Sequence, residues 1–511
     1  MATAGVREGD DRVFVTADHR ERTEVAQADP RSHADGSLWP RWLFLRALGL
    51  IFLSAFYSLA FQIHGLIGER GILPAGPYLR EVRTVLGGAQ GVWYAPTLLW
   101  LDAGDRALAI VVGAGLVSSA LLVVNVWPRV SIALSTLLFL SCIAALQDFS
   151  SYQSDGMLLE AGFLSLFYAP RGIRPGLGAS DPSSRFSRFM LVWEWFRIYF
   201  ESGVVKLASG DPHWRDFTAM DEYYQNGPLP TWLGWYVQHL PHWYHAGTVI
   251  ITFAVELVIV WFAFLPRPLR LACFAFVTAL QVGIIATANY AFLNYLVLVL
   301  GVLLLDDAIL VRLGFRAPAA ADPRPRHAIW RRIETGVLAF AFYATLVAFS
   351  SPLSSSPLGW PARVLAPFRI ANAYGLFAVM TEARYEIEFQ GSRDGVTWIA
   401  YPFRYKPQDI YERPGIYAPY QPRFDWNLWF ASLGPWEQSS WVVLAQQRLL
   451  ENSPSVLRLF RSNPFADRPP ALVRTVRWQY WFTDAETRRR TGAWWRRAEL
   501  GPFTGVVGSA R

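Results

Sequence analysis

Long apolar segments recur along the first two thirds of the chain, and this pattern restricts the fold more than any other feature. A bilayer core of about 30 Å needs about 20 apolar residues in a helix, and most of the segments approach this length. The three shortest are expected to be tilted, re-entrant or buried half-helices. The nine segments lie near residues 43–64, 106–126, 130–148, 157–169, 187–207, 246–265, 269–289, 291–305 and 336–350.

Composition supports a membrane protein. The 511 residues are 53% hydrophobic and only 17% charged, which is less charge than a soluble chain of this length usually carries. The net charge of +7 does not indicate a nucleic-acid partner, because many basic residues lie in short loops between apolar segments. Only two of the 47 basic residues are lysines. This arginine bias is typical of a GC-rich genome and indicates a bacterial source.

The distribution of arginine predicts the orientation. Cytoplasmic loops of membrane proteins carry an excess of Lys and Arg. With the N-terminus inside, the inner loops contain most of the loop arginines, and the outer loops contain only Arg70, Arg80, Arg83 and Arg215. We therefore expect a cytoplasmic N-terminus and an outward C-terminal region, in the cell membrane of a bacterium or the endoplasmic reticulum membrane of a eukaryote.

The C-terminal region has the pattern of a folded domain. Residues 385–405 alternate apolar and polar side chains on both sides of a turn at 392–395, and residues 475–482 alternate likewise, as strands do. Residues 441–460 indicate two short helices separated at Ser453-Pro454. We predict a disordered tail over 1–38, a helical multi-pass domain over 39–350 with about seven to nine transmembrane or re-entrant helices, and a β-rich extracytoplasmic domain over 351–511.

Ionisable residues interrupt the apolar segment at 187–207. Glu194, Arg197 and Glu201 share one helical face, which must contact other helices or a wet cavity. An internally paired network and a functional cavity are both consistent with this stripe. Lys206 lies off the stripe, near the outer end of the segment. It either extends to the interface or, with a pKa lowered by burial, acts as a base, which an arginine cannot do.

Other polar residues are predicted to line the same outward cavity. Asp155 and Glu160 lie near the start of an apolar segment, where a helix cap with a buried hydrogen-bond partner is the alternative. Asp211 and Trp214 follow Lys206 closely. A group of three histidines at three-residue spacing has a proline within it, so we expect interfacial residues and no metal site: His239, His242 and His245.

Several blocks resemble the lipase maturation factor family. They include "ESGVVKLASGDPHWRDFTAMDEYYQNGPLPTWLGWY" (201–236), "NAYGLFAVMT" (372–381), "GSRDGVTW" (391–398) and "APYQPRFDWNLWFASLG" (418–434). The blocks occur in order over nearly the whole chain. The resemblance implies a multi-pass protein that helps secreted lipases reach their active form, with residues 352–505 as the region of client contact. Within that region it implies a client-contact role for Asn372, Tyr374, Asp425, Trp426 and Trp429.

A shorter resemblance concerns chemistry. "YFESGVVKLASGDPHW" (199–214) is similar to a lysine-containing helix end of the vitamin K-dependent carboxylase family. The resemblance implies that Lys206 is a catalytic base acting on a quinone-like lipid.

The sequence thus predicts a membrane-embedded maturation factor with no cofactor, whose partners are the bilayer and an exported client such as a lipase. The alternative is a membrane enzyme that uses Lys206 on a lipid-soluble substrate. The chain carries neither a G-x-S-x-G elbow nor a phosphate-binding glycine loop, so it is not expected to be a lipase or an ATPase itself.

Overall fold

The structure is a computed structural model that describes residues 36–150, 152–319, 321–322 and 327–508. The described residues belong to one compact unit that begins at Gly36. Nearly all of the predicted tail (1–38) lies outside the described residues, so this prediction is not tested.

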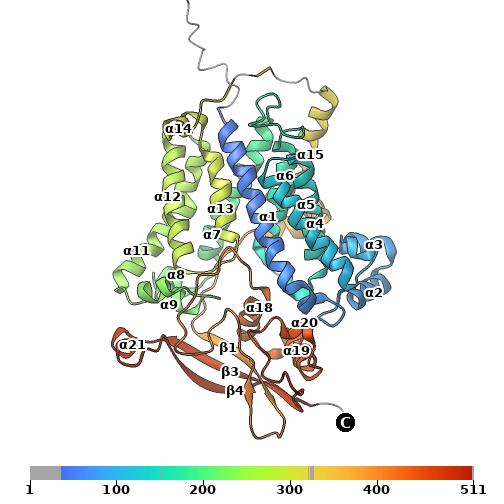
Figure 1. Ribbon diagram of the computed structural model, residues 1–511. Helices are drawn as coiled ribbons and strands as arrows, with labels where there is room; N and C mark the ends of the chain where they lie inside the picture. The colour runs from blue at the N-terminus through green and yellow to red at the C-terminus, as the bar shows by residue number, and fades with distance from the viewer. Residues whose placement is uncertain (1–35, 151, 320, 323–326, 509–511) are drawn as a thin grey trace, which may run out of the picture. The chain divides into compact units, whose positions relative to one another are not determined.

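A bundle of helices forms the N-terminal part of the described chain (Figure 1). Within the described residues, six helical segments are long and apolar enough to cross a membrane, which confirms the predicted multi-pass helical domain. The segment His242–Phe264 combines the helix α11 with the turns η3 and η4. The six are α1 (Leu38–Ile67), α4 (Asp105–Val123), α5 (Pro128–Ala145), His242–Phe264, α12 (Arg267–Thr287) and α15 (Ala328–Phe349).

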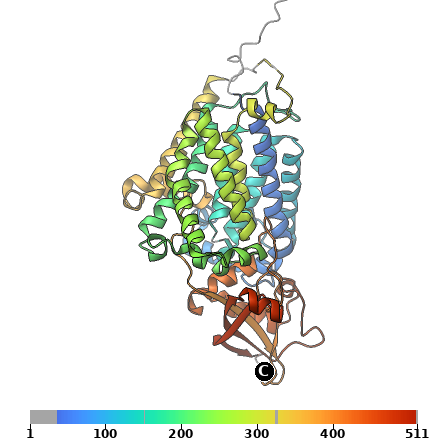
Figure 2. The same cartoon turned by 90° about the vertical axis from the view of Figure 1, so that its left-hand side faces the viewer.

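Three further predicted segments are also helical and complete the bundle. The helix α6 is short, α7 has the length of a span but carries the ionisable residues, and α13 continues into a short 3-10 turn. All three are rich in buried side chains, because they pack between the longer helices (Figure 2). Their bounds are α6 (Gln153–Tyr168), α7 (Arg185–Ala208), α13 (Leu293–Gly301) and η5 (Val302–Leu304).

Close packing of α1 against α4 depends on one glycine. A Cβ placed on Gly115 would lie 2.2 Å from Cε1 of Phe56, far inside van der Waals contact. The absence of a side chain therefore allows the Phe56 ring to rest against the α4 backbone.

Exposed aromatic side chains lie near both ends of the bundle. Trp and Tyr are enriched at the two membrane–water interfaces, so these residues mark where a bilayer would surround the bundle. Trp127 directly precedes α5 and Trp330 lies near the start of α15, whereas Trp93, Trp243 and Trp360 lie in the helices 88–94, 242–253 and 360–365; all five are exposed.

Short helices connect the spans and lead into the C-terminal region. Most of them connect consecutive long helices in the chain, and the last four of those given below connect α15 to the first strand. Their bounds are α2 (Ala75–Leu86), α3 (Gly88–Tyr94), η1 (Leu98–Trp100), η2 (Gln147–Ser150), α8 (Pro212–Arg215), α9 (Ala219–Asn226), α10 (Trp232–Gln238), α14 (Asp307–Arg312), α16 (Ser351–Ser355), η6 (Pro357–Gly359), α17 (Trp360–Leu365) and η7 (Ala366–Phe368). The span His242–Phe264 consists of α11 (His242–Phe253), η3 (Ala254–Val258) and η4 (Ile259–Phe264).

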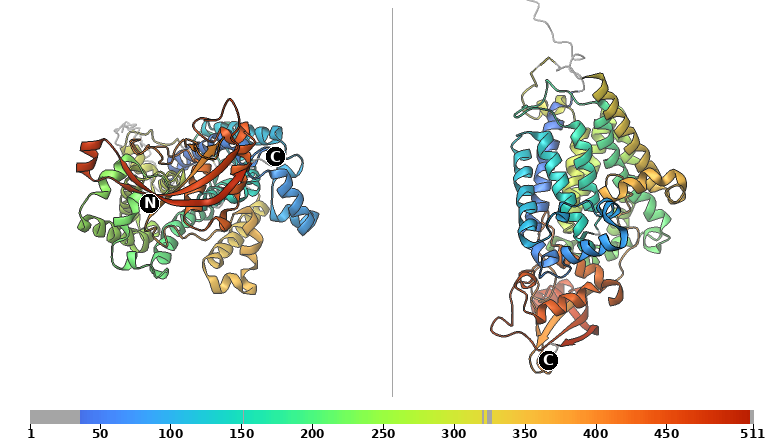
Figure 3. Two further views of the ribbon diagram at one scale, coloured as in Figure 1. Left: turned by 90° about the horizontal axis from the view of Figure 1, so that it is seen from below. Right: turned by 90° about the vertical axis from the view of Figure 1, so that its right-hand side faces the viewer.

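A curved antiparallel sheet with the order β2-β1-β3-β4 lies at one end of the bundle (Figure 3). This confirms the predicted β-containing C-terminal domain, with both predicted strand regions in the sheet and helices at 441–450 and 454–457. The elements are β1 (Arg384–Ser392), β2 (Ile399–Ala400), α18 (Arg423–Ser432), η8 (Trp436–Ser439), α19 (Trp441–Leu450), α20 (Pro454–Leu457), β3 (Leu472–Phe482), α21 (Ala485–Thr491) and β4 (Trp495–Gly508).

The turn between β1 and β2 is fixed by Asp394. Its Oδ1 accepts hydrogen bonds from the backbone N–H of Val396 (2.8 Å) and of Thr397 (2.7 Å) and from the Ser392 hydroxyl (3.0 Å). These bonds stabilise the ionised carboxylate and hold the pKa of Asp394 well below its usual value.

The bundle and the C-terminal region share one hydrophobic core. Buried side chains of α1, α5 and α6 belong to the same continuous cluster as those of β1, α18 and α19. The C-terminal region is therefore packed onto the bundle and not joined to it by a free linker.

Candidate functional site

Residues 372–381, here called the strap, run without helix or strand between η7 and β1. Side chains of the bundle hold the backbone of the strap. Glu201 accepts from the N–H of Tyr374 (2.7 Å), and Asp211 accepts from the N–H of Met380 (2.6 Å). Hydrogen bonds from backbone N–H groups to carboxylates are stronger than neutral ones, so these two acids fix the strap near both of its ends.

A buried charge network lies under the start of the strap. The Arg197 guanidinium pairs with the carboxylate of Glu160 and donates to the carbonyl of Asn372 at 2.6 Å. The other oxygen of Glu160 accepts from the Tyr374 hydroxyl (2.8 Å) and from Nδ2 of Asn372 (2.9 Å). These four residues tie α6, α7 and the strap together, and their charges are paired as a low-dielectric interior requires.

The remaining members of the predicted stripe lie beside this network. Glu201 Oε1 is 4.0 Å from Arg197 Nη1, and its other oxygen holds the strap. Glu194 is fully buried one turn before Arg197, and among the described residues it makes no hydrogen bond to the strap.

Lys206 is buried, with 3% of its surface exposed. Its Nζ lies 2.9 Å from both carboxylate oxygens of Glu256 and 5.3 Å from the centroid of the Trp214 ring. The indole N–H of Trp214 donates to the carbonyl of Phe377 at 3.0 Å. Lys206 thus pairs α7 with the π-helical turn η3, next to the ring that holds the middle of the strap.

The helix α18 is anchored separately by Asp155. Both carboxylate oxygens of Asp155 accept from the guanidinium of Arg423, at 2.8 and 2.7 Å, and both residues are buried. The two parallel bonds fix distance and orientation together. They place Trp426 and Trp429 against the end of the bundle that is nearest the sheet.

Asp425 faces the opposite way, toward the sheet. Its Oδ1 lies 3.3 and 3.4 Å from the backbone nitrogens of Tyr405 and Lys406. The Lys406 ammonium is paired with Glu386 at 2.7 Å. Burial raises the pKa of the Asp425 carboxyl to about 6, and the nearby Lys406 charge only partly opposes this rise.

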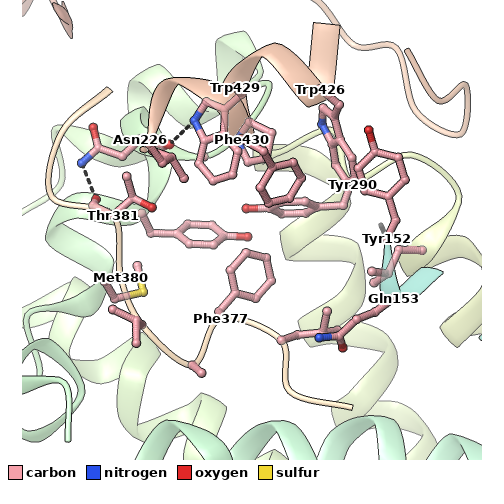
Figure 4. A pocket seen from close by; sticks show the side chains of 18 of the residues that line it. Tyr152, Gln153, Asn226, Tyr290, Phe377, Met380, Thr381, Trp426, Trp429 and Phe430 are labelled. Atoms are coloured by element: carbon pink, nitrogen blue, oxygen red, sulfur yellow. Dashed lines mark hydrogen bonds between the residues drawn. The ribbon is translucent and has the colours of Figure 1, made fainter. Parts of the chain in front are cut away.

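A cavity of about 360 Å³ opens between the strap, α18 and the end of the bundle. Its walls are mainly aromatic (Figure 4), with rings from Tyr152, Tyr223, Tyr290, Phe377, Trp426 and Phe430. Apolar walls with a few polar groups are typical of ligand pockets of this size.

Hydrogen bonds connect the walls of this cavity, here called the strap cavity. The indole N–H of Trp429 donates to the carbonyl of Asn226 (3.1 Å), and the Asn226 amide donates to the carbonyl of Thr381 (2.8 Å; Figure 4). The rim is apolar and accessible: Val379 is 67% exposed and Phe430 is 48% exposed. The strap cavity is therefore mainly apolar, and its walls come from three separately anchored segments.

The structure brings most of the predicted site residues to the strap. Glu160, Arg197, Glu201, Asp211 and Trp214 bind its backbone or its side chains, as described above. Two predicted client-contact residues, Trp426 and Trp429, line the strap cavity, whereas Lys206 and Asp425 do not.

Sequence analysis missed several residues of this region. Glu256 had a recognisable signal, since a single acid in an apolar helix requires a buried partner. Arg423 and the rim residue Phe430 had none. Asp221 was also missed: it accepts from Nδ1 of His242 (2.9 Å) and of His245 (2.7 Å), and thus supplies an acidic partner to two of the three predicted interfacial histidines.

Comparison with known proteins agrees with this architecture. Residues 39–312 match the lipase maturation factor transmembrane domain, and residues 370–505 match the lipase maturation factor C-terminal domain. No solved structure matches the chain.

The chain is also similar to known proteins over most of its length. The chain is 33% identical to lipase maturation factor 1 of Bos taurus over 506 residues, covering 92% of this chain and 89% of the relative. It is 32% identical to human lipase maturation factor 2 over 589 residues, covering 92% of this chain and 82% of the relative. The strap and α18 both fall within the matched C-terminal domain. This chain is therefore a member of the lipase maturation factor family, built as a multi-pass membrane protein.

Proposed function

We propose that this protein is a membrane-embedded maturation factor that assists exported proteins, with lipases as the first class of client to test. The names of its relatives support this role. The single structural observation that carries the proposal is the half-open aromatic strap cavity, which lies at the C-terminal domain end of the bundle and has an exposed apolar rim.

The physical basis is transient burial of apolar surface. An incompletely folded client exposes apolar side chains, and each Å² removed from water contributes about 25 cal/mol. A cavity of about 360 Å³ covers only a small part of a client's apolar surface, so the client is held weakly. It leaves when its own core or subunit interface buries the same side chains.

The strap cavity is proposed to face the outside of the cell or the lumen of the endoplasmic reticulum. The arginine-rich loops are at the opposite end of the bundle, where α6 joins α7 and where α14 lies (Figure 1). The positive-inside rule assigns that end to the cytoplasm.

Lysine chemistry is the alternative function. Burial of Lys206 beside Trp214 supports it. Against it, the Lys206 ammonium is paired with Glu256, and Lys206 is not among the described residues that line the strap cavity. A base for a quinone-like lipid would need a route to that substrate.

Deletion of the gene in its host tests the two functions. We expect the specific activity of at least one exported hydrolase to fall and to be restored by the wild type and by Lys206→Arg. The variant Phe430→Asp should fail to restore it, whereas Val396→Asp, at the exposed tip of the β1–β2 turn, should succeed. Unchanged activity of all exported hydrolases would contradict the maturation role. Failure of Lys206→Arg, at normal protein levels, would favour lysine chemistry.

A further inference from the structure

The charge of the strap cavity is one-sided. Among the described residues that line it, Glu222 is the only Asp, Glu, Lys or Arg. Its Oε2 accepts from Asn226 at 2.9 Å, and its side chain is half-buried. Such a site favours a cationic ligand and disfavours the headgroup of an anionic lipid or a fatty acid.

The backbone of the strap is strained where it forms the cavity wall. Phe377 has φ +57°, in the left-handed region that a phenylalanine rarely adopts. The bond from Trp214 to its carbonyl stabilises this conformation. Strain of this kind is concentrated at ligand-binding sites, and here it turns the Phe377 ring into the cavity (Figure 4).

These observations together define a ligand. The rings accommodate a bulky apolar side chain, and the Glu222 carboxylate can pair with a positive charge beside it. We propose that the strap cavity binds a segment of the client in which a bulky apolar residue lies next to Lys or Arg. This inference rests on the maturation role and gives it a recognition rule.

Binding is measured with the full-length protein in nanodiscs of neutral phospholipid. The probe is a fluorescein-labelled octapeptide that contains Phe-Arg at its centre, and the two matched peptides contain Phe-Glu and Ser-Arg. We expect fluorescence anisotropy to show tighter binding of the Phe-Arg peptide than of either control. Equal binding of all three peptides would overturn the proposal.

Three variants locate the site. Ala378→Trp fills the cavity and should abolish binding, whereas Val396→Trp, far from it, should not. Glu222→Gln removes the charge and should weaken binding of the Phe-Arg peptide about threefold to tenfold, as expected for one such interaction. Thermal unfolding of each variant verifies the fold. Unchanged binding by Ala378→Trp would overturn the proposal.

A fatty acid probe separates a lipid from a peptide. The probe is a fluorescent twelve-carbon fatty acid. The peptide assignment would be overturned if this fatty acid bound the wild type, did not bind Ala378→Trp, and displaced the Phe-Arg peptide. In the host, an Ala378→Trp protein that fully restores hydrolase activity would overturn the role of the cavity while leaving the maturation role intact. If Ala378→Trp fails to restore hydrolase activity, the result supports both the maturation role and the role of the cavity.

Discussion

The hydroxyl of Tyr374 donates to the carboxylate of Glu160 at 2.8 Å, although the two residues are 214 positions apart in the chain. This bond joins the strap to the interior of the bundle. The strap, which forms part of the cavity wall, is thereby anchored to the buried charge network. The bond thus connects the membrane domain to the proposed client site.

Removing the Tyr374 hydroxyl should loosen the strap. In Tyr374→Phe, Glu160 loses one of its donors, and the expected cost is about 1–3 kcal/mol of stability. We expect a lower thermal midpoint and faster proteolytic cleavage within 372–381. The control Tyr411→Phe removes a hydroxyl from a residue that is 60% exposed and should change neither. Equal cleavage rates in the two variants would refute the anchoring role of this bond.

The Lys206–Glu256 pair should show strong coupling. Lys206→Met leaves a buried carboxylate without its partner, which costs about 3–5 kcal/mol. The double variant Lys206→Met/Glu256→Gln removes both charges and should recover most of that loss. The measurement is thermal unfolding of the four proteins of the cycle in one detergent. Additive effects would show that the pair does not stabilise the bundle as a unit.

The bidentate pair of Asp155 and Arg423 should not tolerate lysine. Arg423→Lys keeps the charge but cannot form two parallel bonds, so the position of α18 should become less well defined. We expect tryptophan fluorescence to shift to longer wavelength as Trp426 and Trp429 become hydrated. The matched change Arg490→Lys, on the exposed part of α21, should leave the spectrum unchanged; a similar shift in both variants would argue against this anchor.

The raised pKa of Asp425 predicts that the stability of the folded protein depends on pH. Its pKa is raised from the ordinary 3.8 to about 6 in the folded state, so the folded protein binds a proton more tightly than the unfolded chain between these values. The free energy of unfolding should therefore fall as the pH rises from about 4 to about 6, by roughly 3 kcal/mol at most.

The variant Asp425→Asn does not titrate and isolates this contribution. Its thermal midpoint should vary less than that of the wild type over the same pH range. Because Lys406 and Glu386 face the same region, the comparison is the difference between the two proteins and not either curve alone. Parallel curves would show that folding does not raise the pKa of Asp425.

The sequence by itself determined the architecture of this protein. All nine apolar segments fall on helices, and the alternation at 385–405 and 475–482 corresponds to β1, β2 and β3. These predictions succeed because a membrane span and a half-buried strand each leave a local periodic pattern. The ordered sequence blocks also identified the family, since they extend over nearly the whole chain.

Only the tertiary structure decided which residues meet. Glu256 lies 50 positions from Lys206 and Arg423 lies 268 positions from Asp155, and no local pattern predicts such pairs. The strap has neither helical nor strand periodicity. Its backbone is held by side chains of α6 and α7 and by Asp211 and Trp214 at α8, and not by a ladder of its own. The strap cavity exists only where these distant segments converge, so its lining could not be deduced from the sequence.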